Sequence, residues 1–340
     1  MKKTMVVFFV LAFIVGSGIC FGDQTGINLL PARTVTALDN VTRAYYNTVS
    51  SAQIGVVIDG KIVFTKSYRT NNVNVVKEWA SISKPATAMI VMQLIREGYI
   101  DSLDDNIWVY SHDSNADDST SDYSRCLPSY YNEMSIRRVL RHMAGLPGPN
   151  PANIWTSFPN GTLRITSSRY GRYNYSTTGF SIVGDVIEDA TNMTYQQLVH
   201  RYLRDQNPLY PHTLTTRYAV RADYRQPYTN LSWQTPSSYV RSSILDLAKF
   251  AAGEMLGYYI TEAEEEEMYQ QRIGWMQNYT TYGGQSFPCL YHTGDNGTAN
   301  RAVCIIDRTN DIAVVILYSG SSTSIREAWA KNLMNVIYSN

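Results

Sequence analysis

The amino-acid sequence predicts an α+β protein, with one antiparallel sheet flanked by helices and an all-helical lobe inserted between the two parts of the sheet. Three observations support this fold class. A helix-like segment and a strand hairpin lie near the N-terminus, a long middle region has helical periodicity, and strand-like runs return before a final helix. The 340 residues suffice for one large domain with an extensive core.

A hairpin predicts the N-terminal part of the sheet. Residues 36–50 have helical spacing, with apolar side chains on one face. Residues 53–68 then form two strand-like runs joined by Asp59-Gly60, and Asp-Gly is a strong signal for a two-residue hairpin turn. We therefore expect a helix and two paired strands before residue 80.

The middle of the chain, about residues 81–284, is predicted to form the helical lobe. Ser81 opens an apolar helix that continues over residues 86–96 and ends at Gly98. Pro85 is compatible with this helix because it lies in the first turn. Further helices are predicted at residues 135–141, 180–188, 195–204 and 243–256, and the acidic run at 262–267 is interpreted as a solvated helix face.

The C-terminal part completes the predicted sheet. Residues 302–306 and 312–318 are apolar runs joined by a turn at 307–311, and residues 324–338 form a closing helix. The sheet lobe is therefore expected to consist of about residues 36–80 and 285–340. A cleft between the sheet and the helical lobe would be the natural ligand site.

Residues 1–22 are predicted to be a signal peptide. A basic start precedes an apolar stretch at residues 5–15 that is too short to span a bilayer. Cleavage is predicted after Gly22 or one to four residues earlier, and the large Ile19 disfavours lipid attachment at Cys20. The mature chain, residues 23–340, is expected to be secreted or extracytoplasmic and to have no membrane span.

Export permits two kinds of modification. Cys289 and Cys304 flank a short polar segment between strand-like runs, so we hypothesise a disulfide across a hairpin, with Cys126 free or paired outside the chain. A glycoprotein is expected only if the source has a eukaryotic secretory pathway. The Asn-x-Ser/Thr sites are Asn40, Asn160, Asn174, Asn192, Asn230, Asn278 and Asn296.

The composition argues against several classes of function. The formal net charge is zero and there is no basic stripe, which argues against nucleic acid as a partner. The five histidines are scattered without ligand-like spacing, so no metal site and no cofactor are expected, and His142 is interpreted as structural. The expected partner is a small-molecule or peptide substrate, and the oligomeric state stays open.

The segment Ser81-Ile82-Ser83-Lys84 is a candidate for a catalytic serine with a neighbouring base. Side chains three residues apart share a face of a helix, so the serine hydroxyl and the lysine amine can meet. A serine hydroxyl is a weak nucleophile unless a neighbouring group takes its proton, and a desolvated lysine has a lowered pKa that suits this role. In the alternative structural interpretation, Ser81 caps the helix and Lys84 is a solvated charge.

Two further segments follow in an informative order. Tyr175-Ser176-Thr177 lies in the helical region, and His292-Thr293-Gly294 follows a strand. With the Ser-x-x-Lys segment they resemble the serine β-lactamase and penicillin-binding-protein superfamily. The chain is most similar to the branch of class C β-lactamases, D-alanyl-D-alanine carboxypeptidases and esterases. The resemblance covers about residues 36–338 and includes the segments 94–105, 136–147 and 243–250.

The resemblance implies a β-lactamase/transpeptidase-like fold and a role for individual residues. Ser81 would be the acylated nucleophile, Lys84 would hold or accept its proton, and Tyr175 would relay a proton as phenol or phenolate. The backbone N–H groups of Ser81 and Asp295 would form the oxyanion hole. The residues implied in substrate binding are Thr177, His292, Thr293, Gly294 and Asp295.

Three positions depart from the family pattern. Thr177 stands where asparagine is usual, and a hydroxyl reaches less far than an amide that both donates and accepts. His292 replaces the lysine of class C β-lactamases and is expected to offer a partial charge at neutral pH. Asp295 adds a carboxylate that would repel an anionic substrate or weaken the oxyanion hole. Efficient β-lactamase activity is therefore not expected.

The sequence thus predicts an exported serine hydrolase that forms an acyl-enzyme with esters, small amides or D-amino-acid peptides. The departures at Thr177 and Asp295 motivate an alternative, in which a catalytically weak or inactive member of the family acts as a binding protein. Turnover of an ester substrate would separate these two hypotheses.

Overall fold

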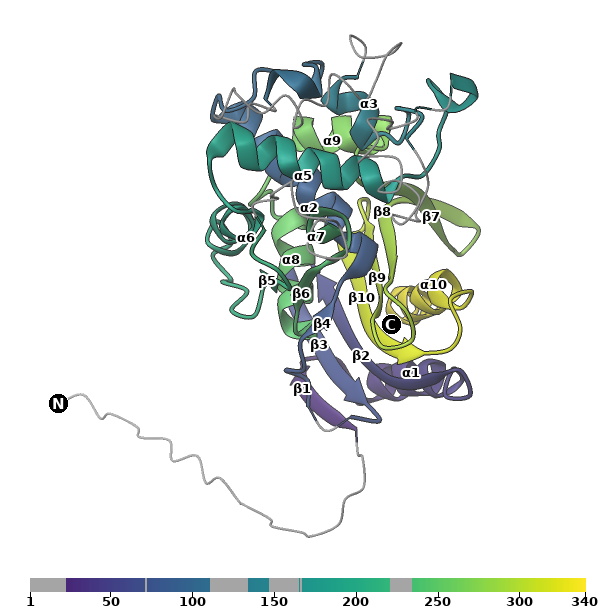
Figure 1. Ribbon diagram of the computed structural model, residues 1–340. Helices are drawn as coiled ribbons and strands as arrows, with labels where there is room; N and C mark the ends of the chain where they lie inside the picture. Colours follow the sequence, from purple (N-terminus) through teal and green to yellow (C-terminus); the bar gives the residue numbers. More distant parts are fainter. Residues whose placement is uncertain (1–22, 71, 111–133, 147–164, 166, 221–233) are drawn as a thin grey trace, which may run out of the picture.

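A seven-stranded antiparallel sheet is the largest element of the fold (Figure 1). The computed structural model describes residues 23–70, 72–110, 134–146, 165, 167–220 and 234–340. The predicted signal peptide, Cys126, Asn160 and Asn230 lie outside these residues. Within the described part, no helix is long and apolar enough to cross a membrane.

Both ends of the chain contribute to the sheet, as predicted. The strand order is β1, β3, β2, β10, β9, β8, β7, and the antiparallel pairing of β2 with β10 joins the two ends near the middle of the sheet. Strands β1 and β7 extend it at the edges, beyond the predicted segments. The bounds are β1 Gln24–Asn28, β2 Val49–Ile58, β3 Lys61–Tyr68, β7 Met276–Tyr282, β8 Gln285–Asp295, β9 Arg301–Asp307 and β10 Ile312–Gly320.

The predicted hairpin turn joins β2 to β3. Asp59 and Gly60 have φ angles of 50° and 69°, the left-handed conformation that a two-residue turn of this kind requires. A Cβ atom on Gly60 would lie 2.6 Å from the exposed side chain of Leu256, which would have to shift. The positive φ of the turn is therefore what selects glycine here.

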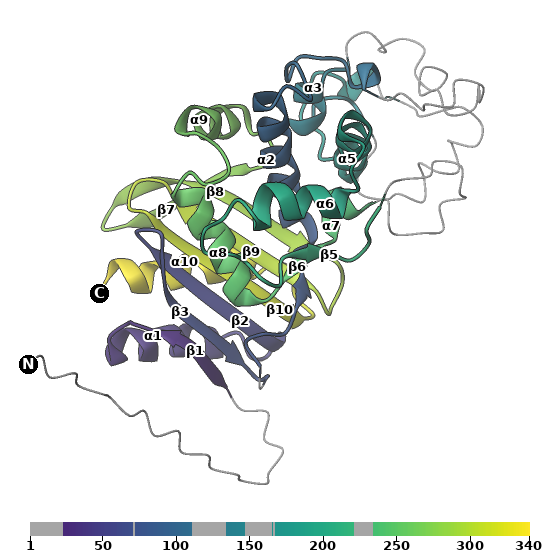
Figure 2. The ribbon, with the colours of Figure 1, turned by 90° about the vertical axis from the view of Figure 1, so that its left-hand side faces the viewer.

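Helices cover both faces of the sheet. Helices α1 (Ala32–Arg43) and α10 (Arg326–Tyr338) pack against each other and enclose the core on one face. Helix α8 (Ile244–Met255) lies across the other face, against β2, β3 and β10 (Figure 2). The sequence placed α8 in the helical lobe. It packs on the sheet because its apolar side, including Leu247 and Ala248, shares one core with Val57 and Val315.

The other helices gather beyond one end of the sheet (Figure 1). Apart from α8, they include every helix predicted for this lobe. The layer also contains a small sheet in the order β4, β6, β5, which was not predicted because strands of two or three residues have no readable periodicity. The bounds are α2 Ser83–Arg96, α3 Ile136–Leu140, α5 Thr177–Thr191, α6 Tyr195–Val199, α7 Thr235–Ser238, α9 Glu262–Gln271, β4 Lys77–Glu78, β5 Thr215–Thr216, β6 Val240–Ser242, a π-helical turn His200–Arg204 and three-ten turns Ala80–Ile82 (η1), Ile107–Val109 and Ser167–Arg169.

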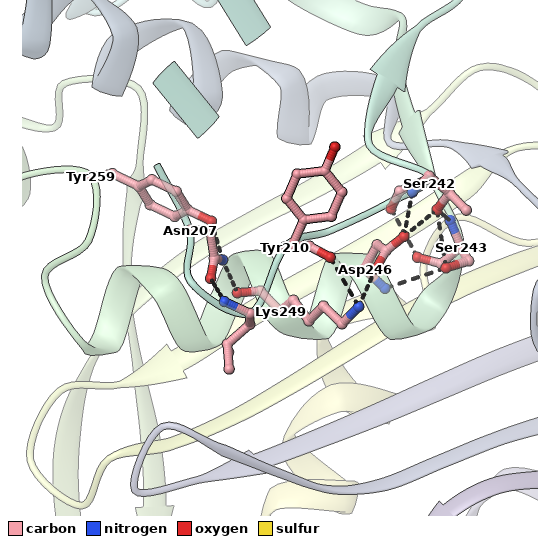
Figure 3. A network of polar contacts seen from close by, with 9 residues as sticks. Asn207, Tyr210, Ser242, Ser243, Asp246, Lys249 and Tyr259 are labelled. Atoms are coloured by element: carbon pink, nitrogen blue, oxygen red, sulfur yellow. Dashed lines mark hydrogen bonds and ion pairs between the residues drawn. The ribbon is translucent and has the colours of Figure 1, made fainter. Parts of the chain in front are cut away.

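A polar network fixes α8 to the preceding chain (Figure 3). Asp246 accepts hydrogen bonds from the backbone N–H and the hydroxyl of Thr213, both at 2.6 Å, and forms an ion pair with Lys249 at 2.9 Å. Ser242, just before α8, accepts from Nε1 of Trp79 at 2.9 Å. The network therefore connects α8 to the segment that leads into the Ser-x-x-Lys motif.

The hypothesis of a disulfide between Cys289 and Cys304 is wrong, because both thiols are free and buried. In the pairing of β8 with β9, Cys289 lies opposite Asp307 and Cys304 lies opposite His292. Cys289 belongs to the core on the α10 side of the sheet and Cys304 to the core on the α8 side. Since strand residues alternate between faces, this register keeps the two sulfur atoms apart.

We therefore predict two free thiols in the folded protein. Alkylation after denaturation without reductant, followed by peptide mapping, should modify both Cys289 and Cys304. In the native protein the reaction should be slow, because burial excludes the reagent and raises the pKa of both thiols. A cross-linked peptide containing both cysteines would contradict the register of β8 and β9.

Candidate active site

The Ser-x-x-Lys motif spans the join between η1 and α2. Ser81 lies in the three-ten turn, which runs directly into the helix that contains Lys84. Ser81 is half-buried and Lys84 is fully buried. Nζ of Lys84 lies 3.0 Å from Oγ of Ser81, so the i, i+3 spacing brings the two groups into direct contact.

The residue before Ser81 has an unusual backbone conformation. Ala80 has a φ angle of 49°, a left-handed conformation that costs a residue with a side chain of order 1–3 kcal/mol. The neighbouring Trp79 is fixed on both sides: its N–H donates to the carbonyl of Val240 at 2.8 Å and its ring packs on Phe250, 4.8 Å away. Tertiary contacts therefore hold the turn that presents Ser81.

Helix α7 holds Lys84 from a second side. Nζ also donates to the carbonyl of Ser237 at 3.0 Å. The packing around α7 is tight, since a Cβ atom on Gly184 in α5 would lie 2.0 Å from Pro236. Thr87 of α2 donates to the carbonyl of Pro236 at 2.5 Å. The sequence does not indicate this support, because a backbone carbonyl has no side-chain signature.

Burial changes the acid–base chemistry of Lys84. The loss of hydration lowers its pKa from 10.5 to about 7. Among the described residues, no carboxylate forms an ion pair with this amine. A substantial share of Lys84 is therefore neutral near pH 7 and able to take a proton from the hydroxyl of Ser81.

Tyr175 contacts the same serine. Its hydroxyl forms a hydrogen bond with Ser81, and Nζ of Lys84 lies 4.9 Å from the centre of its ring. Burial raises the pKa of Tyr175 to about 12, despite the lowering effects of the Ser81 hydrogen bond and of the Arg326 charge. Of the two forms that the sequence left open, the structure favours the phenol.

His142 supports the loop that carries Tyr175. The two rings lie 4.5 Å apart, and Nδ1 of His142 accepts the backbone N–H of Ser176 at 3.0 Å. Burial and the neighbouring Lys84 and His292 lower the pKa of His142 well below its ordinary value. The neutral ring can therefore accept the N–H of Ser176 at Nδ1. His142 is structural, as predicted from the sequence, and the part it supports is the loop that carries Tyr175.

The side chain of Ser176 caps α5, and Thr177 is the first residue of that helix. The Ser176 hydroxyl accepts from the N–H of Gly179 at 3.1 Å, which fixes where the helix begins. Thr177 is buried directly beyond this cap. The segment therefore presents Tyr175 from a loop and Thr177 from the first helical turn.

Strand β8 brings the C-terminal motif against η1. Its pairing with β7 ends at Tyr291, and the remainder of β8 lies along the three-ten turn. A Cβ atom on Gly294 would lie 2.1 Å from the carbonyl oxygen of Trp79. Only glycine permits this close approach of the two backbones, which explains the glycine of the predicted motif.

His292 is buried and neutral, which corrects the expectation of a partial charge. Nδ1 lies 2.7 Å from the carbonyl of Thr293, so Nδ1 carries the proton and Nε2 retains a lone pair. Nε2 is buried and has no hydrogen-bond partner among the described residues. Burial and the nearby Lys84 lower the pKa of His292 to about 3, because two buried cations repel each other.

The side chains of Thr293 and Asp295 alternate with His292 along β8. A side-chain hydrogen bond joins Thr293 to Tyr291, which faces the α10 side of the sheet. The Asp295 carboxylate accepts from the N–H of Gly297 at 3.0 Å and lies 3.3 Å from Arg301. These contacts direct the carboxylate into the β8–β9 turn and pair it with Arg301.

The backbone N–H of Asp295 points toward η1. Asn296 donates its N–H to Asn300 in the connection to β9 at 2.9 Å. Backbone N–H groups of successive strand residues point to opposite edges, so the N–H of Asp295 points away from β9. Beyond Tyr291 that edge of β8 faces the turn that contains Ser81.

Comparison with known proteins identifies the family. The profile of the Beta-lactamase family matches residues 38–335. The chain belongs to the beta-lactamase family. No curated protein matches the sequence.

Solved structures show the same fold at low sequence identity. The family member described here matches the D-amino acid amidase from Ochrobactrum anthropi SV3 complexed with L-phenylalanine (TM-score 0.69, 15% identity, covering 91% of this chain and 99% of that one). It also matches the Beta-Lactamase/D-Alanine Carboxypeptidase from Pseudomonas syringae (0.67, 14%, 89% and 99%). A third match is the octameric penicillin-binding protein homologue from Pyrococcus abyssi (0.66, 16%, 91% and 77%).

In this beta-lactamase-family protein, Ser81, Lys84 and Tyr175 come together as the sequence predicted, and Lys84 lies close enough to His292 to lower its pKa. Thr293 and the Asp295 carboxylate face the other side of β8, although the Asp295 N–H points away from β9, along the edge of β8 that packs on η1. The contributions that sequence reasoning missed come from His142 and from the carbonyl of Ser237.

The pKa of Lys84 predicts how activity depends on pH. If neutral Lys84 takes the Ser81 proton, kcat/KM for an ester should rise with pH up to about 7 and then level off. Lys84→Met should remove this dependence and lower kcat/KM by about 10²–10⁴-fold. A wild-type profile that is flat between about pH 5 and 9 would contradict the assignment.

Stability offers a second measurement of the same group. Between about pH 7 and 10 the unfolded lysine holds a proton that the folded Lys84 has released, so the free energy of unfolding should rise with pH. Lys84→Met should lack this rise and be more stable than wild type below pH 7. Urea unfolding of both proteins across this pH range measures the difference. If the free energy of unfolding depends on pH in the same way in both proteins, Lys84 is not buried without a carboxylate partner.

Proposed function

We propose that this protein is an exported serine hydrolase that is acylated at Ser81 by esters and small amides, including derivatives of D-amino acids. The observation that carries the proposal is the 3.0 Å contact between Nζ of Lys84 and Oγ of Ser81, made by an amine whose pKa burial lowers to about 7. A half-buried serine next to a base of matched pKa is the arrangement that nucleophilic catalysis requires.

Acylation begins with attack of Oγ of Ser81 on the carbonyl carbon of the substrate. Lys84 takes the hydroxyl proton while the new C–O bond forms. The negative charge on the former carbonyl oxygen is stabilised by the N–H groups of Ser81 and Asp295, and one donor of this kind is typically worth about 3 kcal/mol.

The tetrahedral adduct then loses the leaving alcohol or amine. The leaving atom takes a proton from the Lys84 ammonium, either directly or through the hydroxyl of Tyr175, which remains a phenol at neutral pH. Water attacks the acyl group on Ser81 and Lys84 takes a proton from that water. The bond between the acyl carbon and Oγ of Ser81 then breaks, Lys84 returns the proton to Oγ, and the carboxylic acid product leaves. This cycle needs no cofactor.

The chemistry of His292 favours particular substrates. The neutral ring offers no positive charge, so it gives a free substrate carboxylate no ion-pair partner. The solved structures of similar fold include a D-stereospecific amidohydrolase from Streptomyces sp. and a D-amino acid amidase from Ochrobactrum anthropi SV3. We therefore expect small amides and esters to be better substrates than peptides with a terminal carboxylate.

A fluorophosphonate probe tests the nucleophile. We expect it to label wild type and not Ser81→Ala, with a matching mass increase of the intact protein. Ser83→Ala is the matched control, because Ser83 is fully buried and its hydroxyl accepts the N–H of Val240 at 3.1 Å. Equal labelling of wild type and Ser81→Ala would refute Ser81 as the nucleophile. A folded wild type that neither reacts nor turns over a p-nitrophenyl ester would favour the binding-protein alternative.

The residue at position 177 should tune the preference between amides and esters. In Thr177→Asn the longer side chain both donates and accepts, so hydrolysis of D-amino-acid amides should increase by up to about tenfold relative to p-nitrophenyl esters. Thr177→Val, which keeps the shape and loses the hydroxyl, should show no such gain. An equal fall of both activities in Thr177→Asn would show that this residue does not select the substrate.

A further inference from the structure

The peptide unit between Gly294 and Asp295 has two functional ends. Its N–H belongs to Asp295 and faces the turn that contains Ser81, and its carbonyl belongs to Gly294. A trans peptide is planar and directs these two groups in opposite directions. Any group that fixes the carbonyl of Gly294 therefore also fixes the direction of the Asp295 N–H.

Arg326 makes that contact. It is the first residue of α10, and its Nη1 donates to the carbonyl of Gly294 at 3.0 Å. Nε of the same guanidinium donates to the carbonyl of Thr323 at 2.9 Å. The second bond ties the planar guanidinium to its own loop, so Arg326 reaches the Gly294 carbonyl from a fixed position.

We propose that Arg326 is a positioning residue that orients and polarises the Gly294–Asp295 peptide, so that the N–H of Asp295 serves as a donor in the oxyanion hole. The proposal rests on the proposed function, because it assigns a role within the same acylation site. A hydrogen bond from a charged donor to a peptide carbonyl strengthens the N–H of that peptide as a donor, by about 10–30%.

Two further contacts make this peptide a rigid unit. Gly294 lies against the carbonyl of Trp79 so closely that no side chain fits. The Asp295 carboxylate is tied to the N–H of Gly297 and to Arg301 on the α10 side. With Arg326 on the carbonyl, both sides of the peptide unit are held, and the freedom left to the N–H is small.

Arg326 also carries a charge that acts on the neighbouring acid–base groups. It contributes to lowering the pKa of Tyr175 and of His292. A change at Arg326 therefore has two separable effects, one through the charge and one through the hydrogen bond. Arg326→Lys keeps the charge and one donor, and Arg326→Met removes both.

The direct readout is the amide signal of Asp295, which does not depend on activity. Protein labelled at glycine carbonyl carbons and aspartate nitrogens gives a selective signal for each Gly–Asp peptide, and the predicted mature chain contains this dipeptide at 184–185 and 294–295. In Arg326→Met the Asp295 signal should move and its hydrogen exchange should accelerate, while the Asp185 signal inside α5 stays in place. Arg326→Gln serves the same purpose if Arg326→Met does not fold.

Kinetics supply the second readout. For a p-nitrophenyl ester, Arg326→Met should lower kcat by about 10- to 100-fold and change KM by less than about threefold, because the oxyanion forms only in the transition state. Arg326→Lys should recover most of kcat. The carbonyl stretch of the acyl-enzyme should shift to higher frequency in Arg326→Met, since a weaker oxyanion hole polarises the ester less.

Arg308→Gln controls for a general loss of stability. Arg308 lies in the turn that follows β9. It forms ion pairs with Glu265 and Glu266, each at 2.6 Å, and contacts no residue of the site among the described residues. This variant should leave the Asp295 signal and kcat unchanged. An unchanged Asp295 signal in Arg326→Met, or an effect on KM alone, would overturn the proposal.

The outcomes also separate this inference from the proposed function. A wild type that is not acylated refutes the hydrolase proposal, and the Asp295 amide signal then still decides whether Arg326 orients the peptide. An acylated wild type whose kcat and carbonyl stretch are indifferent to Arg326→Met leaves the hydrolase standing and refutes the role of Arg326.

Discussion

The contact between the buried amine of Lys84 and the hydroxyl of Ser81 is the interaction on which the rest of the site depends. An amine without water around it and without a carboxylate beside it is a poor place for a proton, so its pKa falls to about 7. This is useful only if the enclosure stays dry. Helices α2, α5 and α7 provide the enclosure, and the carbonyl of Ser237 gives the amine its second partner.

The close packing around this amine explains several residues that would otherwise look incidental. Gly184 permits α5 to approach Pro236, and Gly294 permits β8 to approach the carbonyl of Trp79. Ala80 accepts a left-handed backbone because its neighbours are tied to β6 and α8. Gly184 and Gly294 are places where a side chain would not fit, and Ala80 shapes the turn that presents Ser81.

Electrostatics within the site follow from the same enclosure. Three nitrogen bases, those of Lys84, His142 and His292, are buried near one another, and each positive charge would oppose the next. The two histidines are consequently neutral and Lys84 is the group that exchanges a proton. The sequence resemblance places His292 where class C β-lactamases have a lysine, and here this position is therefore neutral.

By itself the sequence determined the fold class, the main helices, the central hairpin and the pairing of Ser81 with Lys84. These features follow from local periodicity, turn chemistry and i, i+3 spacing, which the chain carries within a few residues. Only the tertiary structure decided the free state of Cys289 and Cys304, the neutrality of His292 and the direction of the Asp295 N–H. Each of these depends on strand register or burial, which arise from residues far apart in the chain and are invisible in any short segment.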